Sequence, residues 1–221
     1  MDGTGELFGP LLEKLPITIK CAVISYKKDK TQSYKELVEY VHNLLPINDD
    51  YIIVAESFSG PIAFELAKNK DPNLKSVIFV ASFLRPPNTL LKLIKWFPLS
   101  LFLRLPIPTK FIKKYMLGEE VNNELIRKLR DVLAKIDTNV LSYRLRQIAS
   151  LNIKSTKLDT RAIYLQPTSD KLVPENNFVD FKNSIENLRI SRVPGPHFLL
   201  QANPSECSAI IETEIRELTK N

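Results

Sequence analysis

The 221-residue sequence is poor in residues that mark special structures, with six glycines, two cysteines, two histidines and one tryptophan. Its cysteines, Cys21 and Cys207, lie far apart and outside any C-x-x-C spacing, which argues against a disulfide framework and a zinc site. A reducing, cytoplasmic setting is the simplest expectation. No stretch of about 18 uncharged apolar residues occurs, and residues 1–5 lack the parts of an export signal, so neither a membrane span nor secretion is expected.

Hydrophobic residues make up 44% of the chain and charged residues 25%, which is the balance of an ordinary globular protein and excludes collagen-like and disordered classes. A folded chain of this length buries roughly 70 to 75% of its unfolded surface, so its core needs no disulfide or metal. The sequence contains no metal-ligand spacing, and we expect neither a metal nor a cofactor.

Short apolar runs alternate with amphipathic helical patterns over most of the chain. The runs are rich in β-branched and aromatic residues, which is typical of strands buried on both faces. This alternation predicts an α/β fold, a mostly parallel sheet with helices on both faces. The predicted strands are 20–26, 51–55, 76–81, 161–166 and 188–193, and the predicted helices are 33–45, 61–70, 176–185 and a last one after Asn203.

Residues 85–158 interrupt this pattern. They are rich in leucine, lysine and proline at first, show a long helical pattern over 119–150, and carry 15 Lys and Arg against 5 Asp and Glu. The rest of the chain carries 16 against 20. We therefore divide the chain into an α/β core, residues 1–84 and 159–221, and a basic helical insertion, residues 85–158.

A candidate nucleophile follows the predicted strand 51–55. Ala55-Glu56-Ser57-Phe58-Ser59 is a relaxed form of the G-x-S-x-G turn, in which small flanking residues allow a sharp turn that exposes the Ser57 hydroxyl. Ser59 is a poorer centre, because Pro61 would then flank it and proline suits a first helical turn. The alternative interpretation of Ser57 is a serine that caps the following helix.

A candidate acid and a candidate base follow two later strands. Asp170 comes after the strand 161–166 and His197 after the strand 188–193. The carboxyl ends of parallel strands meet at one edge, where open α/β sheets bind ligands, and a serine nucleophile needs both partners. Taken alone, Asp170 also suits a turn and His197 a surface loop. His42, the other histidine, is expected to be a solvated residue of the helix 33–45.

Asp2-Gly3-Thr4-Gly5 is a third signal. Two glycines around a small hydroxyl residue let backbone amides turn toward a ligand oxygen, as an oxyanion hole requires. The alternative is a flexible chain end.

Together these motifs resemble the α/β-hydrolase superfamily, and in particular its small lidded carboxylesterase and thioesterase branch, similar in layout to pimeloyl carrier-protein methyl ester esterases. The resemblance rests on residues 2–5, 55–60, 169–174 and 195–198 in the family's order, and it covers nearly the whole chain. It implies that the insertion is a lid. The residues that it implies for the site are catalytic Ser57, Asp170 and His197, the amides of Phe58 and of Met1 or Asp2 as oxyanion hole, and Gly3, Thr4, Trp96, Phe97 and Phe198 as substrate contacts.

One departure from the family pattern concerns the sheet. In the family, the Asp-Gly-Thr-Gly loop follows a buried strand that lies between the counterparts of 20–26 and 51–55, and no such strand precedes Asp2 here. The sheet is therefore expected to contain a gap or to pair differently. A start codon assigned too late, or a trimmed chain, accounts for the missing strand; otherwise the protein is a degenerate hydrolase with an idle Ser57.

The basic insertion suggests partners. Its apolar residues, among them Trp96 and Phe97, have three alternative interpretations: ordinary hydrophobic core, an acyl-chain pocket, or an interfacial surface. Lys92 and Lys95 beside aromatic residues suit an anionic membrane surface, and the basic charge also suits an acidic carrier protein. No nucleic-acid-binding motif accompanies the charge, so nucleic acid is not an expected partner.

The sequence thus predicts an enzyme, a serine hydrolase that cleaves a small-molecule carboxylic ester or thioester of a hydrophobic acyl group through an acyl-enzyme. The alternative is a catalytically idle or N-terminally truncated hydrolase-fold protein that binds a ligand or partner through the insertion.

Overall fold

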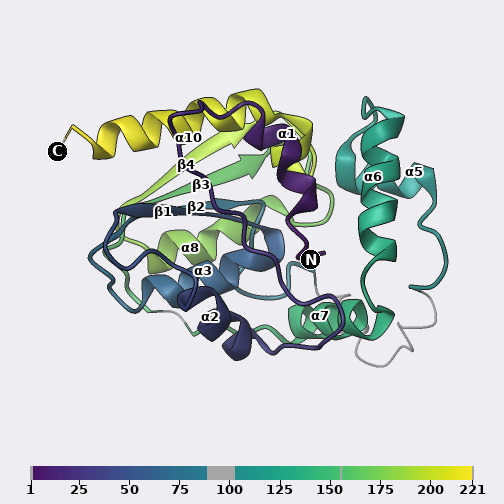
Figure 1. Ribbon diagram of the computed structural model, residues 1–221, viewed down its shortest axis with the longest axis horizontal. Helices are drawn as coiled ribbons and strands as arrows, with labels where there is room; N and C mark the ends of the chain where they lie inside the picture. The colour runs from purple at the N-terminus through teal and green to yellow at the C-terminus, as the bar shows by residue number, and fades with distance from the viewer. Residues whose placement is uncertain (1, 89–102, 155, 221) are drawn as a thin grey trace.

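The computed structural model describes residues 2–88, 103–154 and 156–220 (Figure 1). Within these ranges, four parallel strands form one sheet in the order β1-β2-β3-β4. The strands are β1 (Tyr51–Glu56), β2 (Leu74–Val80), β3 (Ala162–Pro167) and β4 (Leu188–Val193). The sequence predicts all four, with ends that agree to within two residues.

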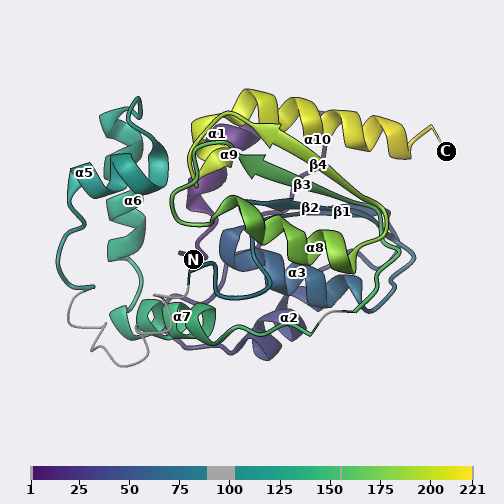
Figure 2. The same ribbon diagram turned by 180° about the vertical axis from the view of Figure 1, so that it is seen from behind.

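Helices cover both faces of the sheet, as predicted (Figures 1 and 2). One face carries α1 (Gly9–Leu12) and α10 (Pro204–Leu218), and the other carries α2 (Tyr34–His42), α3 (Gly60–Ala67) and α8 (Phe178–Ser184). Side chains of β2 alternate between the two cores, because successive residues of a strand point to opposite faces. Ile78 packs with Cys207 of α10, whereas Phe79 packs with Phe64 of α3 and Phe181 of α8.

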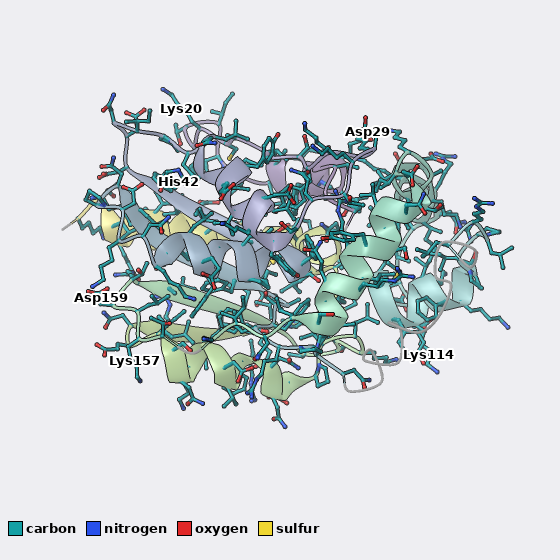
Figure 3. All side chains as sticks on the ribbon, turned by 90° about the horizontal axis from the view of Figure 1, so that it is seen from below. Lys20, Asp29, His42, Lys114, Lys157 and Asp159 are labelled. Atoms are coloured by element: carbon teal, nitrogen blue, oxygen red, sulfur yellow. The ribbon has the colours of Figure 1, made fainter. Side chains whose placement is uncertain are left out.

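The strand predicted over residues 20–26 is not formed. The stretch is extended, but most of its side chains are exposed, with Val23 at 42%. Among the described residues no hydrogen bond joins it to β1, which pairs with β2 alone. β-branched composition favours a strand only where a neighbour takes up the backbone hydrogen bonds. In Figure 3, where Lys20 and Asp29 lie near its ends, the stretch follows the outer border of the molecule.

The described part of the insertion contains α5 (Thr109–Phe111), the π-helix η4 (Ile112–Leu117), α6 (Asn123–Ala134) and α7 (Thr138–Ser150). The long helical pattern predicted over 119–150 is therefore present, but it is divided between α6 and α7. Asn122 and Asp137 each cap one helix by accepting a backbone amide, and such caps mark helix starts. Trp96 and Phe97, like Lys92 and Lys95, lie outside the described residues.

The insertion is placed at the carboxyl ends of the strands. Figure 1 shows α5 and α6 beside that end of the sheet and α7 beneath it. No helix in the described ranges has the length and apolar character needed to cross a lipid bilayer.

Candidate active site

β1 ends in a sharp turn that holds Ser57 in a strained backbone conformation. The short 3-10 helix η2 (Ser57–Ser59) joins β1 directly to α3, and Ser57 has φ of 53°. A non-glycine residue in this left-handed region costs about 1–3 kcal/mol and persists where its surroundings hold it. The Ser82 hydroxyl helps to hold it by donating to the Ser57 carbonyl at 2.9 Å. The Ser57 side chain does not cap α3, which excludes the helix-cap interpretation.

Gly60 and Ser82 fit together behind this turn. A Cβ on Gly60 would lie 1.7 Å from the Ser82 hydroxyl oxygen, so any side chain at position 60 collides with the group that holds Ser57. Ser82 is fully buried, and its carbonyl accepts the Tyr164 hydroxyl at 2.7 Å. Ser82 could not be identified from the sequence, because a serine after a strand carries no signal until the packing is known.

His197 lies between Ser57 and Asp170. Its Nε2 is 2.9 Å from Ser57 Oγ, and its Nδ1 is 2.8 Å from Asp170 Oδ2. Asp170 Oδ1 accepts the amides of Leu172 and Val173 at 2.8 and 2.9 Å, which fixes the carboxylate. The His197 and Asp170 side chains are 7% and 4% exposed, whereas Ser57 is half-buried. The structure therefore brings together the three residues that the sequence singles out.

The two loops that carry Asp170 and His197 follow β3 and β4 and are joined to each other. The Ser169 amide donates to the Gly195 carbonyl at 3.0 Å. His42, the other histidine, is exposed in the last turn of α2, and Figure 3 shows it on the opposite side of the molecule from the insertion. Of the two histidines, His197 is therefore the one that lies at the Ser57 turn.

Such an arrangement can activate a hydroxyl. An imidazole whose Nε2 faces Ser57 Oγ can accept its proton, provided that Nδ1 carries the other ring proton. The Asp170 carboxylate favours that tautomer by accepting from Nδ1, and it stabilises the imidazolium that forms.

The loop of Asp2, Gly3 and Thr4 is held by Arg144 of α7. Arg144 is 3% exposed, and its guanidinium donates to the carbonyls of Asp2 and Lys27. The Asp2 carboxylate accepts the amide and the hydroxyl of Thr4 at 3.0 and 2.8 Å, so these two groups of Thr4 are engaged within the turn. Gly3 has φ of 70°, which favours glycine. Residues 2–4 thus form a hydrogen-bonded turn that is attached to α7.

Phe58, the expected oxyanion donor, is fully buried and stacks on Tyr34, with ring centroids 4.9 Å apart. Its amide lies in the first turn of η2, where amides have no acceptor within the helix, which suits it to bind a ligand oxygen. Burial raises the pKa of Tyr34 well above its ordinary value, and its hydroxyl has no hydrogen-bond partner among the described residues. Of the other two expected donors, Met1 lies outside the described residues, and Asp2 lies in the turn that Arg144 holds.

Phe198 joins the site to the apolar core of the insertion. Its ring lies edge-on to the His197 imidazole with centroids 5.6 Å apart, and its amide donates to the Met116 carbonyl of η4 at 3.0 Å. The apolar core that it contacts contains Leu7, Ile112, Met116, Leu117, Ile126, Leu129 and Val132. Apolar surface therefore lies directly beside the imidazole.

A groove of about 540 Å³ separates the insertion from the two loops, and its charged lining residues are Lys113, Lys114 and Lys171 together with Glu119 and Glu120. Ser57 is not part of this lining, so the groove adjoins the site without containing the hydroxyl. The described part of the chain holds no group of three His, Cys, Asp or Glu side chains that could bind a metal ion.

Glu56 also contacts the site, although the sequence analysis assigned it no function. Its carboxylate accepts hydrogen bonds from Leu200 and Gln201, just after His197. Burial raises the pKa of Glu56, while the Gln201 hydrogen bond and the nearby His197 oppose that rise.

Several solved structures share this fold. MenH from S. aureus is similar at a TM-score of 0.76 and 13% identity, over 99% of this chain and 91% of that one. A lipase-esterase related protein from Clostridium acetobutylicum is similar at 0.74 and 15% identity, over 96% and 90% of the two chains. The type II thioesterase BorB from the borrelidin biosynthetic cluster is similar at 0.69 and 15% identity, over 96% and 88%.

No protein-family model matches the sequence, and neither does any curated protein. The likeness to solved structures, over nearly the whole chain, establishes the fold. The chain has the α/β-hydrolase fold, and the resemblance seen in its motifs is confirmed at that level.

Proposed function

We propose that the protein is a serine hydrolase that cleaves a carboxylic ester or thioester of a hydrophobic acyl group. The observation that carries the proposal is the hydrogen-bonded row of Ser57, His197 and Asp170, with contacts of 2.9 and 2.8 Å. The row begins at a strained serine on a strand-to-helix turn, as nucleophiles of this fold do.

The reaction has two halves. In the first, His197 Nε2 takes the proton of Ser57 while Oγ attacks the carbonyl carbon, and Asp170 stabilises the imidazolium. The Phe58 amide and the amide of Met1 or Asp2 bind the oxyanion. The imidazolium then gives its proton to the departing alcohol or thiol, which leaves an acyl group on Ser57. In the second half, His197 deprotonates water, which attacks the acyl-enzyme, and the acid is released as Ser57 regains its proton.

The surroundings of His197 support a hydrophobic acyl group. Phe198 packs on the imidazole and continues into the apolar core of the insertion, so an acyl chain bound beside Ser57 would replace water on apolar surface. The similar structures include an esterase-related protein and a thioesterase, which supports both kinds of leaving group.

The charge of the insertion supports an anionic partner that presents the acyl group, either an acidic carrier protein or an anionic membrane surface. Lys110 and Lys114 are exposed and Lys113 is half-buried. In Figure 3, Lys114 lies at the outer end of the insertion, away from the sheet. A cluster of one sign raises the local concentration of oppositely charged partners and speeds their association.

Labelling with a fluorophosphonate tests the hydrolase proposal, because this reagent reacts with an activated serine. We expect the purified protein to be labelled and the Ser57→Ala variant not to be. Ser59→Ala is the matched control: this serine lies in the same turn, but its hydroxyl contacts Tyr26 at 3.0 Å instead of His197. Labelling that persists in Ser57→Ala, or no labelling of the unmodified protein, would contradict the proposal.

Product analysis then separates hydrolysis from acyl transfer. Nitrophenyl esters of increasing acyl length are incubated with the protein in the presence of added alcohol. A hydrolase releases the free acid, whereas formation of a new ester would assign the site to an acyltransferase.

A further inference from the structure

Glu56 is a charged residue next to the nucleophile for which the proposed mechanism has no use. Its carboxylate faces α9 (Leu199–Ala202), the short helix that follows His197. Oε1 accepts the Leu200 amide at 3.2 Å, and Oε2 accepts the side-chain amide of Gln201 at 3.0 Å. Leu200 and Gln201 are 1% and 5% exposed, so both hydrogen bonds are shielded from water.

These bonds complete a closed circuit of covalent and hydrogen bonds that contains both Ser57 and His197. Glu56 is covalently joined to Ser57, Leu200 is three residues beyond His197, and His197 returns to Ser57 at 2.9 Å. The other backbone bonds of the His197 loop lead to the Asp170 loop and to the insertion. Among the described residues, the hydrogen bonds between this segment and the turn from β1 into η2 are the His197 to Ser57 contact itself and the two bonds of Glu56.

We infer that Glu56 is a positioning residue, whose carboxylate holds α9 against the turn and so keeps His197 Nε2 within hydrogen-bonding distance of Ser57 Oγ. The inference rests on the proposed function, because positioning matters only if the two atoms exchange a proton. A misplacement of about 1 Å in such a contact can lower a rate by about 10²-fold. Supporting bonds to charged groups are also stronger than neutral ones, which suits a carboxylate to this position.

Two substitutions separate the hydrogen bonds from the charge. Glu56→Ala removes both bonds. Glu56→Gln removes the charge but can keep both bonds, because Gln201 Oε1 is buried and has no hydrogen-bond partner among the described residues. If the Gln201 side-chain amide flips by 180°, its Oε1 can accept a hydrogen bond from the amide of the glutamine at position 56. The carbonyl oxygen of that glutamine can then accept from the Leu200 amide.

The expected results concern kcat rather than KM on a nitrophenyl ester. Glu56→Ala should lower kcat by about 10²-fold with little change in KM, because the chemical step depends on the Ser57 to His197 geometry. Glu56→Gln should recover most of that loss. Glu65→Ala is the matched control and should leave kcat unchanged, because within the described ranges this glutamate of α3 pairs with Lys68 alone, at 2.6 Å. An unchanged kcat in Glu56→Ala, or an equal loss in Glu56→Gln, overturns the inference.

A second measurement does not depend on catalysis. The sequence has only two histidines, so the proton that His197 Nδ1 shares with Asp170 can be assigned by nuclear magnetic resonance. We expect the same chemical shift for this proton in the unmodified protein and in Glu56→Gln, and a different shift in Glu56→Ala, because loss of the Ser57 contact at Nε2 changes the electron density of the whole ring. An unchanged chemical shift in Glu56→Ala overturns the inference. If the unmodified protein is inactive, the proposed function fails while this signal still tests the positioning.

If Glu56→Ala does not fold, Gln201→Leu provides the same test in a milder form. It removes the bond to Oε2 and leaves the bond from the Leu200 amide. An intermediate fall in kcat at constant KM supports the inference, and an unchanged kcat overturns it.

Discussion

Substitution of Gly60 by alanine tests how closely the turn at Ser57 is packed. The backbone at Gly60 is right-handed helical, with φ −59° and ψ −47°, so alanine is compatible with the backbone and the conflict is purely steric. Its Cβ would lie 1.7 Å from Ser82 Oγ and 2.7 Å from Ser82 Cβ. Overpacking of this kind costs about 1–3 kcal/mol. Each kcal/mol lowers Tm by about 2–4 °C in a chain of this size. Fluorophosphonate labelling should also slow, because the displaced hydroxyl no longer holds the Ser57 carbonyl.

The substitution Ser82→Gly should relieve this conflict. It removes both colliding atoms, and the next neighbour of the new Cβ, Phe79 Cδ1, lies at an ordinary 3.7 Å. By itself, loss of the Ser82 hydrogen bond costs about 0.5–1.5 kcal/mol. In the double variant, Gly60→Ala should add no further cost, which gives a coupling free energy of about 1–3 kcal/mol. Urea unfolding of the four proteins of this cycle measures that coupling. Additive losses in the double variant would refute the steric reasoning.

Three further predictions concern other parts of the molecule. Arg144→Met leaves the carbonyls of the N-terminal turn without their charged donor, which should cost about 1.5–3 kcal/mol of unfolding free energy and slow labelling; thermal unfolding at the unmodified Tm would contradict it. Double charge reversal, Lys113→Glu with Lys114→Glu, should weaken co-sedimentation with anionic vesicles or binding to an acidic carrier protein at low salt. Fluorophosphonate labelling should stay unchanged. Binding equal to that of the unmodified protein would argue against the proposed partner surface. Burial alone raises the pKa of Glu214, but hydrogen bonds led by that of Arg161 at 2.7 Å outweigh it and place the pKa below its ordinary value. The stabilisation from Glu214 is therefore complete above about pH 4.3 and is lost as pH falls through the lower native pKa. The free energy of unfolding should fall less steeply with decreasing pH in Glu214→Gln than in the unmodified protein. Parallel pH curves for the two proteins would exclude Glu214 as a source of acid sensitivity.

Much of the fold could be predicted from local sequence. The four strands that form are short, β-branched and followed by turn or helix signals, and each has a neighbour to pair with. Residues 20–26 have the same composition, yet they remain outside the sheet. Whether a stretch becomes a strand depends on a partner backbone that its own residues do not encode.

Some residues of the candidate site could likewise be predicted from local sequence, and others could not. Ser57, Asp170 and His197 could be found because each follows a predicted strand in a recognisable loop. Ser82 and Arg144 could not, because they act on backbone groups 25 and 142 residues away, and such contacts are visible only once the chain is packed. Glu56 is next to Ser57 in the sequence, but its partners lie 144 and 145 residues later.

Arg144 has a consequence for protein engineering. A graft that exchanges the insertion for that of another protein of this fold would naturally replace residues 85–158. Such a graft would also remove α7, and with it the guanidinium that binds the carbonyls of Asp2 and Lys27. A chimera that retains α7 and exchanges only the segment through α6 keeps these contacts, so the helix that ends the insertion should be treated as part of the core.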